Sequence, residues 1–250
     1  MDTERLYDSL WSNTPIRLTL SRQVSRIVAR YLPSSGVILE LGPGTRPRFP
    51  IKSSTTFLDL SPEAVKALRR VGATAFVGNF EKNLPLPEEH FDVVGAFHVI
   101  EHLKDETVLF GEVARVLKPG GYFICGIPLN MSYWTAWDSF VGHYRRYAPQ
   151  DLIALAQRCG LKLRAIYPVR GILPFLVTTA FARIFAPIFV SMIRHTPHIV
   201  YAGERLLTTP LPFVQHSFFS LLQQGNEGKL NLQTAVTLRR CPEAVFIFQR

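Results

Sequence analysis

The chain has 250 residues, 47% of them hydrophobic and 19% charged, and its 28 Lys and Arg against 19 Asp and Glu give a net charge of +9. This composition is typical of one globular domain, with or without a cap, and excludes a disordered chain, a fibre and a disulfide-stapled miniprotein. The three cysteines are scattered without a CxxC pair, which predicts a reducing compartment. The first residues lack a basic stretch followed by an apolar run, so we expect no signal peptide.

Short apolar runs alternate with helical patterns along most of the chain. An amphipathic pattern over residues 18–32 predicts a first helix, which the Pro33–Gly36 segment ends. Strands are predicted at residues 37–40, 56–59, 75–77, 91–96, 122–127, 161–166 and 244–248, and helices at 62–71, 105–117 and 149–159. The alternation predicts an α/β fold, a doubly wound and mostly parallel seven-stranded sheet.

The composition changes after the sixth predicted strand. From Leu152 to Gly203 the sequence contains no Asp or Glu, and Gly171–Ile193 carries a single charge, Arg183. We therefore expect residues 168–240 to form a mostly helical insertion before the last strand. Residues 1–167 and 241–250 then form the sheet domain, with residues 1–36 as an N-terminal helical segment.

The segment 171–194 is apolar along almost its whole length. Thr179, Arg183, Pro187 and Ser191 recur at four-residue spacing, which gives a helix with a narrow polar stripe. We expect this helix first to cap an apolar pocket and second to contact a membrane surface. A true span comes last, because a central Arg costs about 2.5–3.5 kcal/mol on insertion scales. A buried helix of an oversized cap or a homodimer interface remains an alternative.

A glycine-rich turn, Glu40-Leu41-Gly42-Pro43-Gly44-Thr45, follows the first predicted strand. Glycines allow a sharp turn and close approach of a ligand at the carboxyl edge of such a sheet. Asp59 ends the second strand, where a carboxylate can accept from both ribose hydroxyls. Pro47 stands where a dinucleotide fingerprint has its third glycine. The pattern therefore favours a nucleoside without a pyrophosphate and disfavours a nicotinamide oxidoreductase.

Two further motifs follow in order. After the third strand, Gly78-Asn79-Phe80 offers a polar side chain and a backbone N–H that can read an adenine edge, and Phe80 can pack on the ring. Lys118-Pro119-Gly120-Gly121 predicts a tight turn into the fifth strand. Pro47 and Pro50 should shorten or break any helix that follows the glycine turn.

In this order and spacing, these motifs resemble the class I S-adenosylmethionine-dependent methyltransferases, in particular the ubiquinone-biosynthesis-like (type 11) group. The resemblance covers roughly residues 37–166 and the last strand. It implies a Rossmann-like methyltransferase fold, S-adenosyl-L-methionine as cofactor and S-adenosyl-L-homocysteine as product. It is carried by Glu40–Gly44, Leu58–Ser61, Gly78–Phe80 with Leu84-Pro85, Phe91–Val94, His98–Leu103, Leu117–Gly121 and His143–Tyr147.

The resemblance also implies roles for single residues. The methionine end of the cofactor would be held by Glu40 and by the turn residues Gly42, Gly44 and Thr45. Asp59 would hold the ribose, and the adenine would lie among Leu60, Asn79 and Phe80. Phe97 and His98 would close over the sulfonium.

The chain departs from the family pattern at several of these positions. Asn79 stands where the family usually has Asp, and Arg46-Pro47 replaces small residues. These departures leave open the alternative of a catalytically inactive scaffold on the same fold, possibly membrane-associated.

The sulfonium is already activated, so catalysis needs positioning and, for an oxygen or nitrogen acceptor, a base. Candidate residues are His98, His143 and Tyr144, whereas we interpret His102 as structural. Glu101 and His102 could bind a divalent ion, but no third ligand is evident, so no metal is expected. A motif for methylating base or amide nitrogens, Asn-Pro-Pro-Tyr, is absent after the fourth strand, which disfavours nucleic acid.

The sequence therefore predicts methyl transfer to a small, apolar or amphiphilic acceptor, which could be lipid-, quinone- or natural-product-like. The expected location is the cytoplasm, with peripheral contact at the inner face of a membrane as a further option. The identity of the acceptor and the oligomeric state are not predicted.

Overall fold

The computed structural model describes residues 15–16, 22–169, 238 and 241–250. The predicted insertion, 168–240, therefore lies almost entirely outside the described residues, as does the start of the first predicted helix. Within the described part of the chain, no helix has the length and apolar character needed to cross a bilayer.

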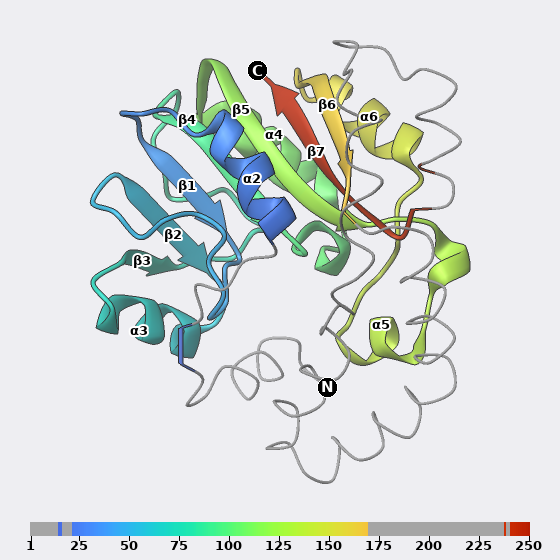
Figure 1. Cartoon of the computed structure of the whole chain (residues 1–250), viewed down its shortest axis with the longest axis horizontal. Coiled ribbons are helices and arrows are strands. Elements are labelled where there is room, and N and C mark those ends of the chain that lie inside the picture. The colour runs from blue at the N-terminus through green and yellow to red at the C-terminus, as the bar shows by residue number, and fades with distance from the viewer. Residues whose placement is uncertain (1–14, 17–21, 170–237, 239–240) are drawn as a thin grey trace, which may run out of the picture.

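A seven-stranded sheet in the order β3-β2-β1-β4-β5-β7-β6 forms the centre of the molecule (Figure 1). Strands β1 to β5 run parallel along that order, and β7 is antiparallel to both of its neighbours. The predicted fold class is confirmed. The strands are β1 Ile38–Leu41, β2 Thr55–Asp59, β3 Thr74–Val77, β4 Phe91–Phe97, β5 Leu117–Pro128, β6 Lys162–Pro168 and β7 Glu243–Gln249.

The helices predicted at 62–71, 105–117 and 149–159 are present, and side chains cap the starts of two of them. Ser61 caps α3 by accepting from the Ala64 amide at 3.2 Å, and Asp105 caps α4 through the Thr107 amide at 2.9 Å. The helices are α2 Arg22–Tyr31, α3 Pro62–Arg70, α4 Glu106–Val116, α5 Ala136–Phe140 and α6 Pro149–Arg158, with short 3₁₀ turns at Ile100–His102 (η1) and Met131–Tyr133 (η2).

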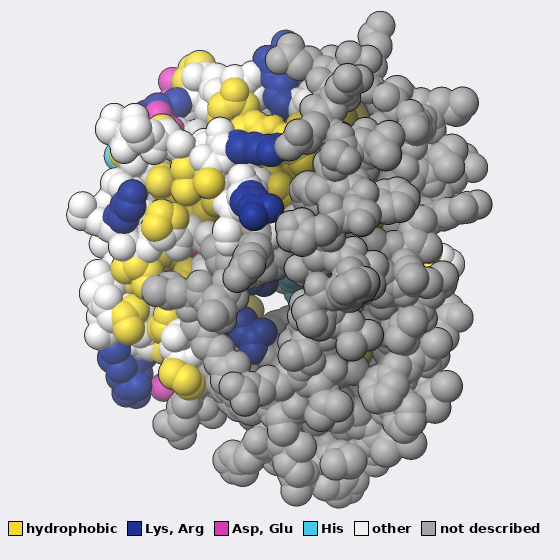
Figure 2. Space-filling model, viewed as in Figure 1, with side chains coloured by type: hydrophobic (Ala, Val, Ile, Leu, Met, Phe, Trp, Pro, Cys, Tyr) yellow, Lys and Arg dark blue, Asp and Glu magenta, His cyan; other side chains and the backbone are white. Residues whose placement is uncertain are grey.

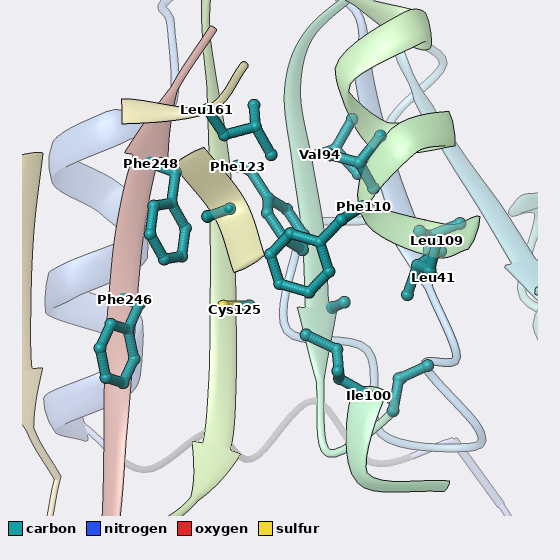
Figure 3. Packing of buried hydrophobic residues seen from close by; sticks show 14 of the residues in the cluster. Leu41, Val94, Ile100, Leu109, Phe110, Phe123, Cys125, Leu161, Phe246 and Phe248 are labelled. Atoms are coloured by element: carbon teal, nitrogen blue, oxygen red, sulfur yellow. The ribbon is translucent and has the colours of Figure 1, made fainter. Parts of the chain in front are cut away.

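Helices cover both faces of the sheet (Figure 1). On one face, α2 packs Ile27 and Val28 in a cluster with Ile124 and Ile247 of the sheet. On the other, α4 and α6 pack against a larger cluster in which Phe110 lies edge-on to Phe123, with ring centroids 5.5 Å apart (Figure 3). Because helices cover both faces, a ligand can reach the sheet only at its edges.

Two boundaries differ from the prediction. Strand β1 is shifted by one residue and ends at Leu41, directly before Gly42. Strand β5 begins at Leu117 instead of at residue 122, because Leu117 already pairs with Phe91 and the Lys118–Gly121 turn bulges out before Tyr122 pairs with Val93. As predicted from Pro47 and Pro50, no helix follows the glycine turn in the described residues between β1 and β2.

Lys and Arg side chains are scattered over the described part of one face of the molecule and do not form a continuous stripe there (Figure 2). Hydrophobic side chains lie between them.

Replacing Phe123 by alanine should strongly destabilise the fold. Its ring is fully buried between Phe110 and Phe248, so the cavity left behind should lower the free energy of unfolding by about 3–5 kcal/mol, measured by urea denaturation. Phe76→Ala is the matched control, because that ring is 47% exposed on the edge strand and should cost less than about 1 kcal/mol. Equal losses in the two variants would contradict this account of the core.

Candidate functional site

The parallel strands β1 to β4 end at one edge of the sheet, where the predicted cofactor residues meet. The amide of Gly42 donates to the Leu58 carbonyl at 2.8 Å, and the amide of Gly78 donates to the Asp59 carbonyl at 2.9 Å. These bonds join the segments that follow β1, β2 and β3. The structure therefore brings the glycine turn, Asp59 and the residues near Asn79 to neighbouring positions.

The glycine turn adopts a conformation that favours glycine at two positions. Gly42 has φ 62° and Gly44 has φ 53°, both in the left-handed region. A Cβ on Gly42 would lie 2.4 Å from Cγ2 of Val99, so the segment after β4 packs directly on the turn. The Thr45 hydroxyl is buried and lacks a hydrogen-bond partner among the described residues. A buried hydroxyl without a partner fits a turn that receives a polar ligand.

Two buried carboxylates hold this turn. Asp59 accepts from the Gly44 amide at 2.7 Å and from the Ser61 amide at 2.9 Å. Glu40 accepts from the amides of Arg48 at 2.7 and 3.0 Å and of Phe49 at 2.8 Å. The sequence predicted both acids as ligand contacts but did not indicate that backbone amides already occupy part of their acceptor capacity.

The environment of Glu40 makes its carboxyl group readily protonated. Only 1% of the residue is exposed. Burial raises the pKa of Glu40 to about 7, although the amides of Arg48 and Phe49 act in the opposite direction. Both protonation states of Glu40 are therefore accessible near neutral pH.

The residues predicted around the adenine differ in exposure. Asn79 is exposed, and its Oδ1 accepts from the Glu81 amide at 2.8 Å, while Leu60 is half-buried. Phe80 is only 7% exposed and belongs to the main core cluster. Phe97 is also buried and lies edge-on to Phe49 with centroids 6.0 Å apart. The two aromatic side chains thus also support the walls of the site.

His98 follows β4 with φ 56° and joins two carboxylates. Its Nδ1 lies 3.2 Å from Oε1 of Glu101, and its Nε2 lies 3.2 Å from Oε1 of Glu243 on β7. Desolvation lowers the pKa of His98, but the charge of Glu243 and the hydrogen bonds to both acids outweigh it and raise the pKa to about 9. The imidazole is therefore positively charged at neutral pH.

A second group of charged side chains lies beside His98, on the segment between β5 and α6. Asp138 is fully buried and contacts both His143 and Arg146. His143 Nε2 lies 3.9 Å from Oε1 of Glu101, and the rings of His143 and His102 are 4.5 Å apart. Sequence reasoning missed Asp138, Arg146 and Glu243. The only available signal was the capping pattern Thr135-x-x-Asp138, which the structure realises at α5.

Glu101, His102 and His143 each offer a ligand atom within 4.8 Å of the others, so His143 is the third residue that the sequence left unidentified. Burial raises the pKa of Glu101, but the His98 hydrogen bond and nearby charges hold it below its usual range. The His98 imidazolium contacts the carboxylates of Glu101 and Glu243, and the Arg146 guanidinium contacts that of Asp138. Cations of the chain itself therefore already lie against these acids, and we assign no metal ligands here.

The charged state of His98 should appear in the pH dependence of stability. A histidine whose pKa is raised from about 6.5 stabilises the fold fully below that pH, and the contribution is lost as the pH rises through about 9. We expect the free energy of unfolding of the native chain to fall between pH 6.5 and 9.5 relative to His98→Gln, measured by urea denaturation. Parallel pH curves for the two proteins would refute this assignment.

Comparisons with known proteins point to methyltransferases. Residues 39–125 match the model of the methyltransferase domain family. The chain is 35% identical over 82 residues to a "Probable S-adenosylmethionine-dependent methyltransferase" of Mycolicibacterium smegmatis, over 32% of each chain. It is 36% identical over 72 residues to the fatty-acid O-methyltransferase of the same organism, over 28% of this chain and 26% of that protein. The chain therefore spans about a third or less of the length of these curated relatives.

A solved structure extends the likeness to nearly the whole chain. Phosphoethanolamine N-methyltransferase 2 of Haemonchus contortus, in complex with S-adenosyl-L-methionine, superposes with a TM-score of 0.56 at 20% identity, covering 98% of this chain and 56% of that one. The cofactor expected from the sequence, S-adenosylmethionine, is the one in the printed name of the first relative and in the complex of this solved structure. Residues 39–125 match the methyltransferase domain family, and the described sheet has the fold of this solved S-adenosylmethionine complex.

Proposed function

We propose that this chain transfers a methyl group from S-adenosylmethionine to a small apolar or amphiphilic acceptor of lipid-, quinone- or natural-product-like character. The observation that carries the proposal is the glycine turn held by Glu40 and Asp59 at the carboxyl edge, inside the matched segment 39–125. The relative named for fatty-acid methylation supports an apolar acceptor.

In this proposal each predicted residue has a task that its position allows. The Asp59 carboxylate accepts hydrogen bonds from the ribose hydroxyls of the cofactor. The turn Gly42–Thr45 and Glu40 contact the methionine end of the cofactor. Leu60, Asn79 and Phe80 border the adenine. When bound, S-adenosylmethionine supplies an activated methyl group, so the chain itself must align the acceptor, exclude water and accept a proton.

The most suitable base among the three candidates is His143. His98 is protonated at neutral pH and both of its ring nitrogens are engaged, so it cannot take up another proton. Tyr144 is 47% exposed, and no described residue contacts it in a way that would activate it. The His143 side chain is only 10% exposed and lies beside Glu101, which follows β4.

We also propose that residues 171–194 cap the acceptor pocket and contact a membrane surface, so that the protein would be cytoplasmic and peripheral at a membrane. The support is the sequence, which has one charged residue, Arg183, between Gly171 and Ile193. These residues lie outside the described part of the chain. A homodimer through the same segment remains an alternative arrangement.

A catalytically inactive scaffold is the second candidate function. Arg46 and Pro47 favour it, because no helix follows the glycine turn in the described residues. The turn therefore lacks the aligned N–H groups with which a helix start binds an anionic group. A scaffold of this kind would bind the cofactor without consuming it. Methyl incorporation therefore separates the two candidates.

Substitution of Asp59 by alanine should weaken cofactor binding at least about tenfold, since a hydrogen bond to a charged group contributes roughly 1.5–3 kcal/mol. Gly42→Val should abolish binding. A valine is strained at the φ of 62° that Gly42 adopts, and its Cβ would clash with Val99. Calorimetric titration with S-adenosylmethionine measures both effects. Asp92→Ala, at the opposite edge of the sheet, is the control. Unchanged affinity in both variants would disprove the proposed cofactor site.

The native chain should incorporate labelled methyl groups from S-adenosylmethionine into the lipid fraction of a cell extract and not into its polar fraction. Scintillation counting of the separated fractions provides the measurement. Deleting residues 173–194 should leave cofactor affinity within about threefold and reduce lipid labelling or liposome association at least about tenfold.

Two results would count against these proposals. Cofactor binding without any labelled product would favour the scaffold. Persistence of both lipid labelling and liposome association in the deletion variant would show that the segment contributes only packing.

A further inference from the structure

Asp138 is a fully buried carboxylate with five hydrogen-bond donors around it. Thr135 donates through its amide at 2.8 Å and its hydroxyl at 2.9 Å, and His143 lies at 2.8 Å through Nδ1. Arg146 adds two bonds, from Nε at 2.9 Å and from Nη2 at 3.0 Å. Burial raises the pKa of Asp138, but the bonds from His143 and Arg146 outweigh it and hold the pKa far below its usual range. Asp138 is therefore a fixed negative charge that can only accept hydrogen bonds.

This arrangement determines the tautomer of His143. Because the ionised Asp138 has no proton to donate, the proton of the shared bond must reside on Nδ1 of His143. The backbone reinforces the geometry, since the His143 amide donates to the Asp138 carbonyl at 2.9 Å and the Tyr144 amide donates to the Glu101 carbonyl at 2.8 Å. In the neutral ring, Nε2 therefore carries the lone pair.

The surroundings of Nε2 suit a group that gains a proton during a reaction. Nε2 lies 3.9 Å from Oε1 of Glu101, which is fully buried, and Oε2 of that carboxylate has no hydrogen-bond partner in the described part of the chain. A proton on Nε2 would face this unsatisfied acid. Among the described residues, the other charged or titratable groups nearby are His102, whose ring lies 4.5 Å from that of His143, His98 across Glu101, and Arg146 across Asp138.

We propose that Asp138 and Arg146 are positioning residues that hold His143 with Nδ1 protonated, so that Nε2 accepts the proton of a hydroxyl-bearing acceptor. This inference rests on the proposed function and specifies phenols and related hydroxyl compounds as the acceptors whose methylation needs this base. The acceptor oxygen forms a bond to the methyl carbon as the carbon–sulfur bond breaks. The electron pair of that bond remains on sulfur, and the acceptor proton moves to His143, whose imidazolium is stabilised by Asp138 and Glu101.

The tautomer can be measured without any acceptor, by nitrogen NMR of the full-length chain with labelled histidine. The native chain should show His143 protonated at Nδ1. In Asp138→Asn the side-chain amide can donate to Nδ1, so the population of His143 should move to the Nε2–H form.

Arg146→Lys keeps a positive charge and should retain the native tautomer of His143 more fully than Arg146→Gln. Asp92→Asn, which breaks the Lys118 ion pair away from the site, is the matched control. A native His143 protonated only at Nε2, or a tautomer unaffected by Asp138→Asn, would overturn the proposal.

Kinetics with two probe acceptors separate positioning of a base from a general structural role. Pentadecylphenol must lose a proton when methylated, whereas palmitate is already ionised at neutral pH. At pH 7, Asp138→Asn should lower kcat for the phenol at least about 100-fold, with partial recovery at higher pH as the phenol ionises. Palmitate turnover and the KM for S-adenosylmethionine should change less than about threefold.

Equal losses with both acceptors would assign Asp138 a structural role and overturn the inference. If the native chain binds S-adenosylmethionine but methylates neither probe, the proposed acceptor class fails, and the NMR tautomer alone decides whether Asp138 positions His143. The two failures are thus distinguishable.

Discussion

The hydrogen bond from the Gly44 amide to the buried Asp59 carboxylate is the interaction on which the site depends. It ties the turn after β1 to the end of β2 at 2.7 Å, and the Ser61 amide donates to the same carboxylate at 2.9 Å. Glu40 fixes the other end of the loop through the amides of Arg48 and Phe49. Because a proline-containing segment replaces the usual helix here, side-chain acceptors supply the constraint that helical hydrogen bonds would otherwise provide.

A second constraint is charge balance in the buried region beside the turn. Two wholly buried carboxylates, Glu101 and Asp138, would be costly in isolation. The structure offsets them with the His98 imidazolium and the Arg146 guanidinium, which arrive from different segments of the chain. His98 also reaches Glu243, so the same network joins β4 to β7 across β5. The edge of the sheet is therefore held together by ionic contacts above an apolar core.

Local sequence patterns were sufficient for the framework of the fold. Continuous apolar runs between helical patterns predicted every strand of the described residues, and the predicted helix starts at residues 62 and 105 lie within one residue of the starts of α3 and α4. The exact start of β5 was less predictable, because Leu117 pairs with Phe91 before a bulged turn that reads locally as a loop. Pairing of this kind depends on a strand distant in the sequence.

The sequence by itself determined that a glycine turn, an acid after β2 and a polar residue after β3 would share one edge, since parallel strands align their carboxyl ends. Only the tertiary structure decided the partners of the histidines. His98 has a carboxylate at 3.2 Å from each ring nitrogen, whereas His143 bonds Asp138 through Nδ1 at 2.8 Å and keeps Nε2 3.9 Å from Glu101. The pKa and tautomer of an imidazole depend on partners brought by β7 and by the segment before α6, and no local pattern records those partners.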